Sequence, residues 1–404
     1  MYDVTIIGSG AAGMMSAITS AKRGKSVLLL EKMPQIGRKL KATGGGKCNL
    51  TNRLEKDEFI DSFGKNGRFM RNAIYEFDNT ALLKFFFNIG LKTETLDGFR
   101  VFPSSRDSQS VLDALEMELK RVKVEVICNQ FVKEVTKTDN LFSIKTQNRV
   151  FKAKNLIIAT GGLGFSSLGT SGDGYRFAKA FNHSIKETYP AMLPLHVEQS
   201  WVKNCRADTI ANATLRVNLP KMKKLQKTGD LIFTKNGIRG PVVLDFSTQI
   251  TPLLDRFGKV PLLVNLTKIT NEEEIKEFLQ QNPQTPIVKT IQKLLPTSLS
   301  VEFCKMLSID EEKPYIQLSK KNIVELAKIL AWTPLSITGH DGFEKAMITK
   351  GGVNLKEIDP KTMQSRLVKN LYFCGEVLDI DGPCGGFNLQ WSFSSGYLAG
   401  CLKD

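Results

Sequence analysis

The first 31 residues constrain the fold of this chain more than any other stretch. They contain two short apolar runs, residues 4–7 and 27–30, separated by an alanine-rich stretch that ends at Gly24. Short, continuously apolar runs are typical of buried parallel strands, and parallel strands need a crossover between them, usually a helix. The stretch therefore predicts a strand, a helix and a second strand, which is the start of an open α/β sheet.

A glycine pattern lies where the first predicted strand passes into the helix. Gly8, Gly10 and Gly13 form the pattern G-x-G-x-x-G, and Glu31 closes the second strand about 20 residues later. Glycine permits a tight turn and lets backbone N–H groups approach a pyrophosphate, while a carboxylate at that distance accepts hydrogen bonds from ribose hydroxyls. Because strand, helix and acid coincide, the pattern indicates a dinucleotide-binding fingerprint rather than an incidental glycine-rich turn.

The remainder of the chain favours FAD over NAD. A second glycine-rich loop stands at residues 44–46, a later strand ends in IIATGG at 157–162, and FCGE stands at 373–376. These segments suit a long cofactor that crosses its domain. The chain has one G-x-G-x-x-G pattern, so we expect NADH or NADPH to dock transiently as electron donor, unless the substrate supplies the electrons.

The pattern of elements changes near residue 190 and changes back near residue 340. Residues 191–265 are β-rich, with strand-like runs ATLRVNL, GDLIFTK and GPVVLDFS, and residues 270–333 are helical. We expect residues 1–190 and 340–404 to form an α/β, Rossmann-like FAD-binding domain. Residues 191–339 would form an inserted domain.

Composition excludes several classes of protein. No apolar run reaches the roughly 18 residues that a membrane-spanning helix needs. Seven cysteines without a C-x-x-C pair indicate neither a disulfide framework nor a dithiol centre, and three scattered histidines lack the spacing of metal ligands. Asp3 stands where a signal peptide carries basic residues, so we expect a cytoplasmic protein without a metal or a membrane anchor. The oligomeric state stays open.

Six segments carry a resemblance to a known family. They are IIGSGAAGMMSA, GRKLKATGGGKCNLTN, NLIIATGG, GDLIFTKNGIRGPVVLDFS, ITKGGVNLKEIDPKTMQSR and LYFCGEVLDIDGPCGGFNLQWSFSSGYLAG. In these segments the chain resembles the BaiN/RdsA-type (YhiN-like) flavoproteins over nearly its whole length. The resemblance implies a tightly bound FAD in a domain of the two-dinucleotide-binding-domain flavoprotein type. It also implies that the insert is β-barrel-like and helical and forms the substrate side.

The resemblance also assigns roles around the cofactor. It implies that Arg38 and Lys39 lie near the cofactor phosphates. Asn49 would bond to the flavin ring, Glu376 would hold the ribityl chain, and the glycines of two later loops would leave room for the ring or the pyrophosphate. The expected cofactor contacts are Gly8, Gly10, Ala11, Ala12, Gly13, Glu31, Lys32, Arg38, Lys39, Gly44, Gly45, Gly46, Asn49, Val132, Thr160, Gly161, Gly162, Gly375, Glu376, Gly385, Gly386, Phe387, Asn388 and Leu389.

Three residues are candidates for the chemistry at the cofactor. Lys47 would stabilise the N1 side of a reduced flavin, and the alternative is a solvated loop lysine. Cys48 and Cys384 are candidate donors of the proton that accompanies hydride addition to a C=C bond, since a thiol with a pKa of about 8.5 is protonated at neutral pH. The alternative for each cysteine is packing. Cys384 is the better candidate because its GPCGG segment exposes backbone on both sides.

Positive charge bears on the substrate. The formal net charge is +15, and residues 203–259 contain eleven Lys or Arg against four Asp or Glu, including KMKKLQK at 221–227. Basic surfaces attract polyanions, although charge runs are also common on solvated hairpins. The candidate RNA contacts are Trp201, as a base-stacking group, and Lys221, Lys223, Lys224 and Lys227.

The resemblance implies two activities, reduction of a uridine in ribosomal RNA to dihydrouridine and reduction of unsaturated bile-acid intermediates. The basic region favours RNA, because a small apolar steroid does not call for such a surface. We expect an FAD-dependent oxidoreductase in which hydride passes from flavin N5 to an activated C=C bond of a uridine in 23S ribosomal RNA. A small-molecule ene-reductase or amine oxidase is the second hypothesis, and a non-catalytic, FAD-stabilised RNA-binding factor is the third.

Overall fold

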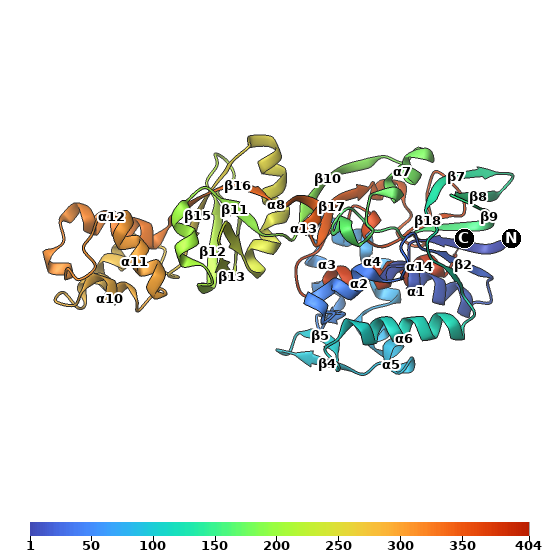
Figure 1. The fold of residues 1–404 in the computed structure, drawn as a ribbon, viewed down its shortest axis with the longest axis horizontal. Helices are drawn as coiled ribbons and strands as arrows, with labels where there is room; N and C mark the ends of the chain where they lie inside the picture. The colour runs from blue at the N-terminus through green and yellow to red at the C-terminus, as the bar shows by residue number, and fades with distance from the viewer. Residues whose placement is uncertain (404) are drawn as a thin grey trace. The chain divides into compact units, whose positions relative to one another are not determined.

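The computed structural model describes residues 1–403, and the chain divides into two compact units. The first unit contains Met1–Tyr189 and the chain from Met347 onward, and the second is Pro190–Ala346. The blue and red segments of Figure 1 interleave in the first unit, so both ends of the sequence build it.

A large sheet forms the centre of the first unit (Figure 1). β1 pairs in parallel with β2 and β9, and α1 (Ala11–Lys22) connects β1 to β2, which confirms the expected strand, helix and strand. The strands, in the order in which they lie, are β6 (Glu125–Ile127), β2 (Val27–Leu30), β1 (Tyr2–Ile7), β9 (Val150–Ile158), β8 (Leu141–Thr146) and β7 (Val132–Thr138), with β18 (Leu371–Phe373) also paired to β9.

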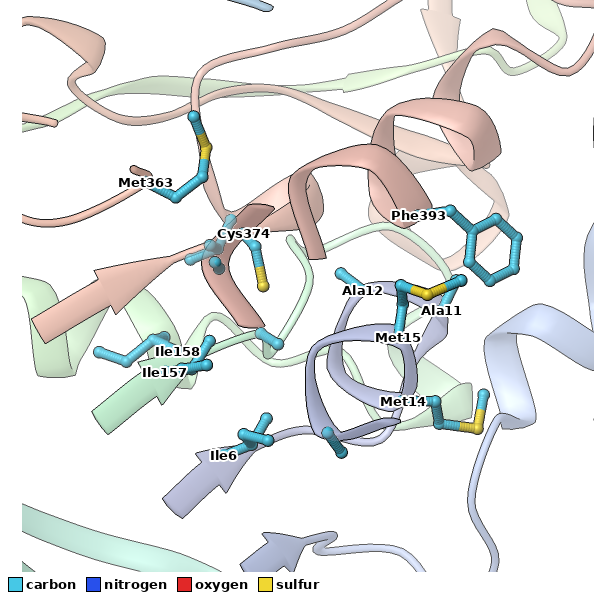
Figure 2. Close-up of a cluster of buried hydrophobic side chains, with 14 of the residues drawn as sticks. Ile6, Ala11, Ala12, Met14, Met15, Ile157, Ile158, Met363, Cys374 and Phe393 are labelled. Atoms are coloured by element: carbon cyan, nitrogen blue, oxygen red, sulfur yellow. The ribbon is translucent and has the colours of Figure 1, made fainter. Parts of the chain in front are cut away.

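Helices from the two ends of the chain pack against each other beside this sheet. α14 (Phe387–Gly400) approaches α1 closely because Gly396 lacks a side chain: a Cβ there would lie 2.4 Å from the carbonyl oxygen of Ala12. Ser20 Oγ of α1 also donates to the carbonyl of Gly400 at 3.0 Å. Figure 2 shows the buried cluster that β1, β9, α1 and α14 share.

Smaller elements surround this core. Residues 67–88 form two helices separated at Phe77 and Asp78, and Asp78 caps the second by accepting from the Ala81 amide at 2.8 Å. The smaller helices of the first unit are α2 (Arg38–Ala42), α3 (Lys56–Asp61), α4 (Gly67–Glu76), α5 (Asn79–Asn88), α6 (Ser108–Arg121) and α7 (Asp173–Ala180). Its smaller sheets are a three-stranded one, in the order β3 (Thr51–Asn52), β5 (Arg100–Pro103) and β4 (Thr93–Leu96), and the pair β10 (Ile185–Ala191) and β17 (Ile348–Val353).

The second unit contains a closed antiparallel barrel (Figure 1). Its strands, in order, are β11 (Leu195–Val197), β14 (Gly237–Arg239), β13 (Gln226–Phe233), β12 (Thr209–Val217), β15 (Val260–Asn265) and β16 (Thr333–His340). β16 follows the helical region in sequence and closes the barrel against β11 and β15. The sequence had suggested that residues 340–346 belong to the first unit. In the structure these residues, which include α13 (Gly342–Lys345), belong to the second unit.

One predicted strand in this unit is a helix. GPVVLDFS, at residues 240–247, opens α8 (Pro241–Phe257). The apolar residues repeat at helical spacing, and Pro at the first helical position favours a helix start. The buried residues of this helix include Val242, Val243, Phe246, Ile250 and Leu254.

Four helices follow in the region expected to be helical. They are α9 (Glu272–Gln280), α10 (Ile287–Ile291), α11 (Thr297–Met306) and α12 (Lys320–Ala331). They share one apolar core with the barrel, so barrel and helices form one unit. Within residues 1–403, no helix has the length and apolar character that crossing a membrane requires.

Candidate functional site

A cleft lies at the carboxyl ends of β1, β2 and β9 in the first unit, where Ile7, Leu30 and Ala159 line it. It encloses about 1280 Å³ of empty space, part of which is open to solvent. Ligands of open α/β sheets bind at this edge. The predicted cofactor contacts that line the cleft are Gly8, Gly10, Ala11, Ala12, Glu31, Lys32, Arg38, Lys39, Val132, Thr160, Gly161, Gly375, Glu376, Asn388 and Leu389.

The other predicted residues of the first unit lie outside this lining. They are Gly13, Gly44, Gly45, Gly46, Lys47, Cys48, Asn49, Gly162, Cys384, Gly385, Gly386 and Phe387. Sequence reasoning missed several lining residues, among them Thr43, Gln130, Phe131, Met347, Ile348 and Trp391. Gln130 follows β6, and its backbone amide donates to the carbonyl of Glu31 at 2.8 Å, which brings it to the end of the neighbouring strand β2.

The glycine fingerprint has the geometry that a bound pyrophosphate needs. Gly10 precedes α1 in an extended conformation, and a Cβ built there meets no atom within 4 Å. The first-turn amides of α1 are therefore approachable from the cleft, and they carry the positive end of the helix dipole. A Cβ at Gly13 would instead lie 1.8 Å from the carbonyl oxygen of Gly8, so Gly13 allows the helix to pack on the strand.

Glu31 is held rigidly at the edge of the cleft. Its Oε2 accepts hydrogen bonds from the amide and hydroxyl of Ser9, at 3.0 and 2.5 Å, and its Oε1 accepts from the Met33 amide at 2.9 Å. These bonds orient the carboxylate and leave further lone pairs available, since an ionised carboxylate has about four acceptor sites. The arrangement fits the role of ribose acceptor.

Two ion pairs flank the cleft. Lys39 Nζ lies 2.6 Å from Glu376 Oε2, and Glu376 Oε1 accepts from the Thr349 amide at 2.8 Å. Lys32 Nζ lies 2.6 Å from Asp173 Oδ2. Both pairs are partly buried, whereas Arg38 has no ion-pair partner within residues 1–403. Arg38 is thus the cation of this group best placed to accept an additional anion.

The three consecutive glycines have a conformational cause. Gly44, Gly45 and Gly46 have φ values of 59°, 65° and 88°, a left-handed region that other residues adopt at a cost. A Cβ at Gly45 or Gly46 would meet no atom within 4 Å. The loop therefore needs glycine for its backbone path, and its expected contact with the cofactor stays a prediction.

Cys48 and Lys47 differ in exposure at the end of this loop. The Cys48 side chain is buried, and burial raises the pKa of its thiol to about 12. A thiol this well shielded packs the core, so the structure favours packing over proton donation for Cys48. Lys47 is exposed, and its expected effect on the flavin stays a prediction.

A second loop, residues 382–388, is hydrogen-bonded to residues that follow the glycine-rich loop at 44–46. Asn388 Nδ2 donates to the carbonyl of Gly382 at 2.8 Å, and Asn52 Nδ2 donates to the carbonyl of Gly385 at 3.0 Å. With its amide oriented to satisfy both ends, Asn49 donates to Val101 and Thr51 carbonyls and accepts from the Gly386 amide. Both N–H groups of Asn49 are used within the protein, so its predicted bond to the flavin ring would fall to its carbonyl oxygen. The half-buried Cys384 lies inside this loop.

The space at Gly386 is filled by the protein itself. A Cβ there would lie 2.5 Å from the carbonyl oxygen of Thr51 in β3. Similarly, a Cβ at Gly162 would lie 2.4 Å from Thr349 Oγ1. At these two positions glycine makes room for a neighbouring strand, whereas the sequence had suggested room for the cofactor at Gly386.

Two carboxyl groups that sequence reasoning passed over lie just before this loop. Burial and the charge of Asp381 raise the pKa of Asp379 to about 6, and burial also raises the pKa of Asp381. Lys350 and Lys186 partly offset the shift at Asp379. The signal was the alternation of two acids in LDIDG, on either side of Ile380, which lines the cleft.

Trp391 brings an unused donor to the cleft. Its side chain is buried and lines the cleft, and its indole N–H has no hydrogen-bond partner among the described residues. A buried donor without a partner costs free energy, roughly 1–3 kcal/mol. Together with the open approach at Gly10 and the oriented Glu31, this donor fits a polar ligand of dinucleotide size.

The second unit carries the predicted basic hairpin between β12 and β13. Leu219, Met222 and Leu225 anchor it to the apolar core. The four predicted lysines of the hairpin are exposed, and none has an ion pair in the described part of the chain. They are Lys221, Lys223, Lys224 and Lys227.

Trp201 packs within the second unit. Its ring centroid lies 5.9 Å from that of Phe233 and 6.0 Å from that of Phe303, and the side chain packs against the second core. These contacts use the ring for packing between barrel and α11. They explain the residue without a base-stacking role.

A family model described as "HI0933-like protein Rossmann domain" matches residues 2–402. The chain belongs to this family. The family expected from the sequence is confirmed, and with it the Rossmann-type FAD-binding fold and the class of FAD-dependent oxidoreductases. Among residues 1–403 no group of three His, Cys, Asp or Glu side chains is arranged to hold a metal ion.

Two relatives in the family match almost the full length of the chain. A 3-dehydro-bile acid delta(4,6)-reductase of Clostridium scindens is 31% identical over 409 residues, covering 99% of this chain and 98% of that protein. A ribosomal RNA dihydrouridine synthase of Haemophilus influenzae is 31% identical over 399 residues, covering 97% and 96%. Equal identity to two proteins with different named substrates leaves the substrate of this family member to other observations.

Solved structures match the family fold at lower identity. A flavocytochrome c3 fumarate reductase in an open conformation matches with a TM-score of 0.53 at 14% identity, covering 99% of this chain and 78% of that one. A 3-ketosteroid-delta4-(5alpha)-dehydrogenase from Rhodococcus jostii RHA1 matches with a TM-score of 0.52 at 14% identity, covering 100% and 97%. These likenesses concern the fold alone.

Proposed function

We propose that this chain is a reductase that converts a uridine of 23S ribosomal RNA to dihydrouridine. The observation that carries the proposal is the basic hairpin, in which the loop between β12 and β13 and the start of β13 carry four exposed lysines without ion pairs among the described residues. Unpaired cations release counterions when they meet phosphates, which is the main source of RNA affinity. A steroid substrate has no use for them. A ribosomal RNA substrate also implies the cytoplasm as the compartment.

The cleft residues would hold FAD in a defined order along the cleft. The amides beyond Gly10 would bind the pyrophosphate, with Arg38 as an additional cation, and Glu31 would accept from the ribose. The Trp391 N–H would donate to a polar group of the cofactor. FAD, when bound and reduced, supplies a hydride for an activated C=C bond.

The chain must supply the proton that completes the reduction. Cys384 is the proposed donor, because it is half-buried in the loop at residues 382–388 and a thiol can act as a general acid. Proton transfer from the thiol to one carbon, with hydride addition to its neighbour, converts the C5=C6 bond of uracil to a single bond. NADH or NADPH is the proposed source of the two electrons.

The test compares dihydrouridine in ribosomal RNA from cells with and without this gene, by mass spectrometry of nucleosides. We expect dihydrouridine to disappear on deletion and to return with the wild-type gene. Cys384→Ala should restore less than a tenth of it if that thiol is the donor, because general-acid catalysis contributes roughly 10²–10⁴-fold in rate. Dihydrouridine that is unchanged on deletion would overturn the proposal.

A matched pair of variants tests the hairpin. Replacing Lys221, Lys223, Lys224 and Lys227 by alanine should weaken binding to ribosomal RNA by at least roughly tenfold at low salt. The control replaces four other lysines of the same unit, each of which has a carboxylate partner: Lys259, Lys276, Lys305 and Lys328. Both variants change the net charge equally, so equal losses would show that net charge and not the hairpin is responsible.

The reductase of Clostridium scindens provides the competing hypothesis, an unsaturated steroid ketone as substrate. The two hypotheses differ in the electron acceptor that reoxidises the reduced protein. We expect faster reoxidation with a uridine-containing RNA fragment than with an unsaturated steroid ketone in anaerobic stopped-flow measurements. The opposite order would favour the small-molecule reductase.

A further inference from the structure

The surface of the barrel carries an arginine–tryptophan stack that the proposed function does not yet use. Arg216 lies near the end of β12, and Trp332 directly precedes β16. The Arg216 Cζ lies 3.9 Å from the centroid of the Trp332 ring, whereas the other arginine contacts with rings range from 4.5 to 6.0 Å. The guanidinium therefore lies against the face of the indole. Both side chains are half-buried, so the stack reaches the surface.

Strand register places this stack beside the basic hairpin. Arg216 pairs with Gln226 of β13 and with Leu263 of β15, and Leu263 pairs with Pro334 of β16. Residues directly opposite one another point to the same face of a sheet. Residues 218–225 connect β12 to β13 directly after Val217, so the segment that carries Lys221, Lys223 and Lys224 begins next to Arg216 and its partner Gln226. Lys227 pairs with Leu215 and therefore lies on the other face of the sheet from Arg216. The stack thus lies at the base of the hairpin, on the side where three of its lysines follow in sequence.

The charge of this surface is unpaired. Neither Arg216 nor any of the four hairpin lysines has a carboxylate partner in residues 1–403, although other lysines of the unit do. A planar cation held flat by an indole loses little conformational entropy when a ligand stacks on it. Arginine planes and aromatic rings are the groups on which proteins stack unpaired nucleobases.

We propose that Arg216, held flat by Trp332, is a stacking platform for an unpaired base next to phosphates bound by the lysine hairpin. The inference rests on the proposed RNA substrate and adds to it a preference for a single-stranded segment. Bases in an A-form duplex are stacked on each other and present no free face, so a platform of this kind selects loops or unfolded segments.

The test separates stacking from charge by measuring RNA affinity at several salt concentrations. Arg216→Lys retains the positive charge and removes the planar group. We expect it to weaken binding of a single-stranded ribosomal RNA fragment roughly tenfold, since stacking of one base contributes a measurable part of such affinity. Its salt dependence should stay that of the wild type, whereas the alanine variant of the four hairpin lysines should show a smaller salt dependence. Arg239→Lys is the matched control, because Arg239 is exposed on β14 of the same barrel and has no ring partner among the described residues.

A second RNA and a second variant complete the test. Binding of a fully paired RNA duplex should be the same for Arg216→Lys and the wild type. Trp332→Leu, with folding checked by its thermal unfolding midpoint, should lose affinity for the single strand as Arg216→Lys does. Wild-type affinity in Arg216→Lys, or equal losses for duplex and single strand, would overturn the platform and leave the RNA substrate standing. Absence of salt-dependent RNA binding by the wild type would overturn both.

Discussion

At the scale of single residues, the same residue type serves different physical needs. Glycine leaves open space in the cleft at Gly10, gives a neighbouring strand space at Gly386, and permits a left-handed backbone at Gly45. The sequence pattern does not separate these causes, because all three positions lie in glycine-rich segments. The contacts of a hypothetical Cβ do separate them, and they predict different outcomes for the same substitution.

Gly10→Ala should leave the fold intact and weaken the cofactor site. The φ of Gly10 is −71° and no atom lies within 4 Å of the added Cβ, so alanine fits the free protein. The methyl group would then occupy the approach to the α1 amides, and we expect FAD affinity to fall at least roughly tenfold. Flavin absorbance per protein and the thermal unfolding midpoint of the flavin-free protein measure the two effects separately.

Gly13→Ala is the contrasting control. Its Cβ would lie 1.8 Å from the Gly8 carbonyl oxygen, so α1 must move away from β1. Here stability and flavin content should fall together. If Gly10→Ala also lowers the stability of the flavin-free protein, the open approach assigned to Gly10 is incorrect.

His183 is a buried residue that sequence reasoning treated only as one of three scattered histidines. Its Nδ1 lies 3.1 Å from Glu357 Oε2, and its Nε2 lies 2.8 Å from Ser365 Oγ. Ser365 Oγ also accepts from two backbone amides, so its proton is directed to the histidine. Burial lowers the pKa of His183, and the neutral imidazole connects the end of α7 to the segment before β18.

Stability of the first unit should therefore decrease as the pH falls below about 6.5. Because the pKa of His183 is lower in the folded state than in the unfolded state, the unfolded state binds more protons in this range, and each such proton lowers the free energy of unfolding by up to about 1.4 kcal/mol per pH unit. His183→Gln should cost roughly 1–3 kcal/mol at neutral pH, and its difference from the wild type should shrink toward about pH 5. Thermal unfolding midpoints across this range provide the measurement, and a difference independent of pH would contradict the assignment.

At the scale of elements, the contact between α1 and α14 links the ends of the chain to the cofactor cleft. Gly396 and Gly400 bring the α14 backbone against Ala12 and Ser16 of α1, and Ala12 lines the cleft. Cores pack densely, so a displaced helix shifts the groups around it. The close approach of these helices therefore sets the wall of the cleft as well as the stability of the unit.

Gly396→Ala should destabilise the first unit by roughly 1–3 kcal/mol, because the added Cβ would lie 2.4 Å from the Ala12 carbonyl oxygen. Flavin content should fall in parallel, since Ala12 would be displaced. Gly339→Ala is the matched control: the nearest atom to its Cβ lies 3.9 Å away and its backbone is not left-handed. Chemical unfolding and flavin absorbance of the two variants test this coupling, which fails if both behave alike.

At the scale of the whole molecule, the chain is two units with separate cores. The first contains the cleft and the second contains the basic hairpin. The chain leaves the first unit through β10 and returns through β17, and these two strands pair with each other. The two chain segments that lead into and out of the second unit are therefore held together by strand pairing.

A variant in which a short glycine linker replaces residues 192–346 should fold and bind FAD but not RNA. The physical reason is that the linker would join two paired strands, so the sheet and core of the first unit keep their contacts. Flavin absorbance and RNA binding, compared with the intact chain, measure the two properties. Loss of flavin would show that the second unit is needed for the cofactor site, and retained RNA affinity would place the RNA surface elsewhere.

Much of the fold could be predicted from local pattern. The strand, helix and strand of the first 31 residues and the return of the C-terminal segment to the first unit both follow from apolar runs and glycines. The helix at residues 241–257 was misread as a strand, because four apolar residues within GPVVLDFS satisfy both interpretations until the longer helical repeat is considered. The final barrel strand, β16, was separated from its partners by the helices in the sequence, so its place depended on long-range pairing.

The sequence by itself determined the dinucleotide fingerprint, the family and the basic character of the insert, because each depends on residue types at short spacing. Tertiary structure alone decided which glycines border open space and which border protein atoms, that Cys48 and Trp201 are packed, and that Asp379 and Asp381 lie close enough to interact. It also brought Arg216 and Trp332, 116 residues apart in the numbering, into one stack. Burial and face-to-face contact arise from segments distant in sequence, and no local pattern encodes them.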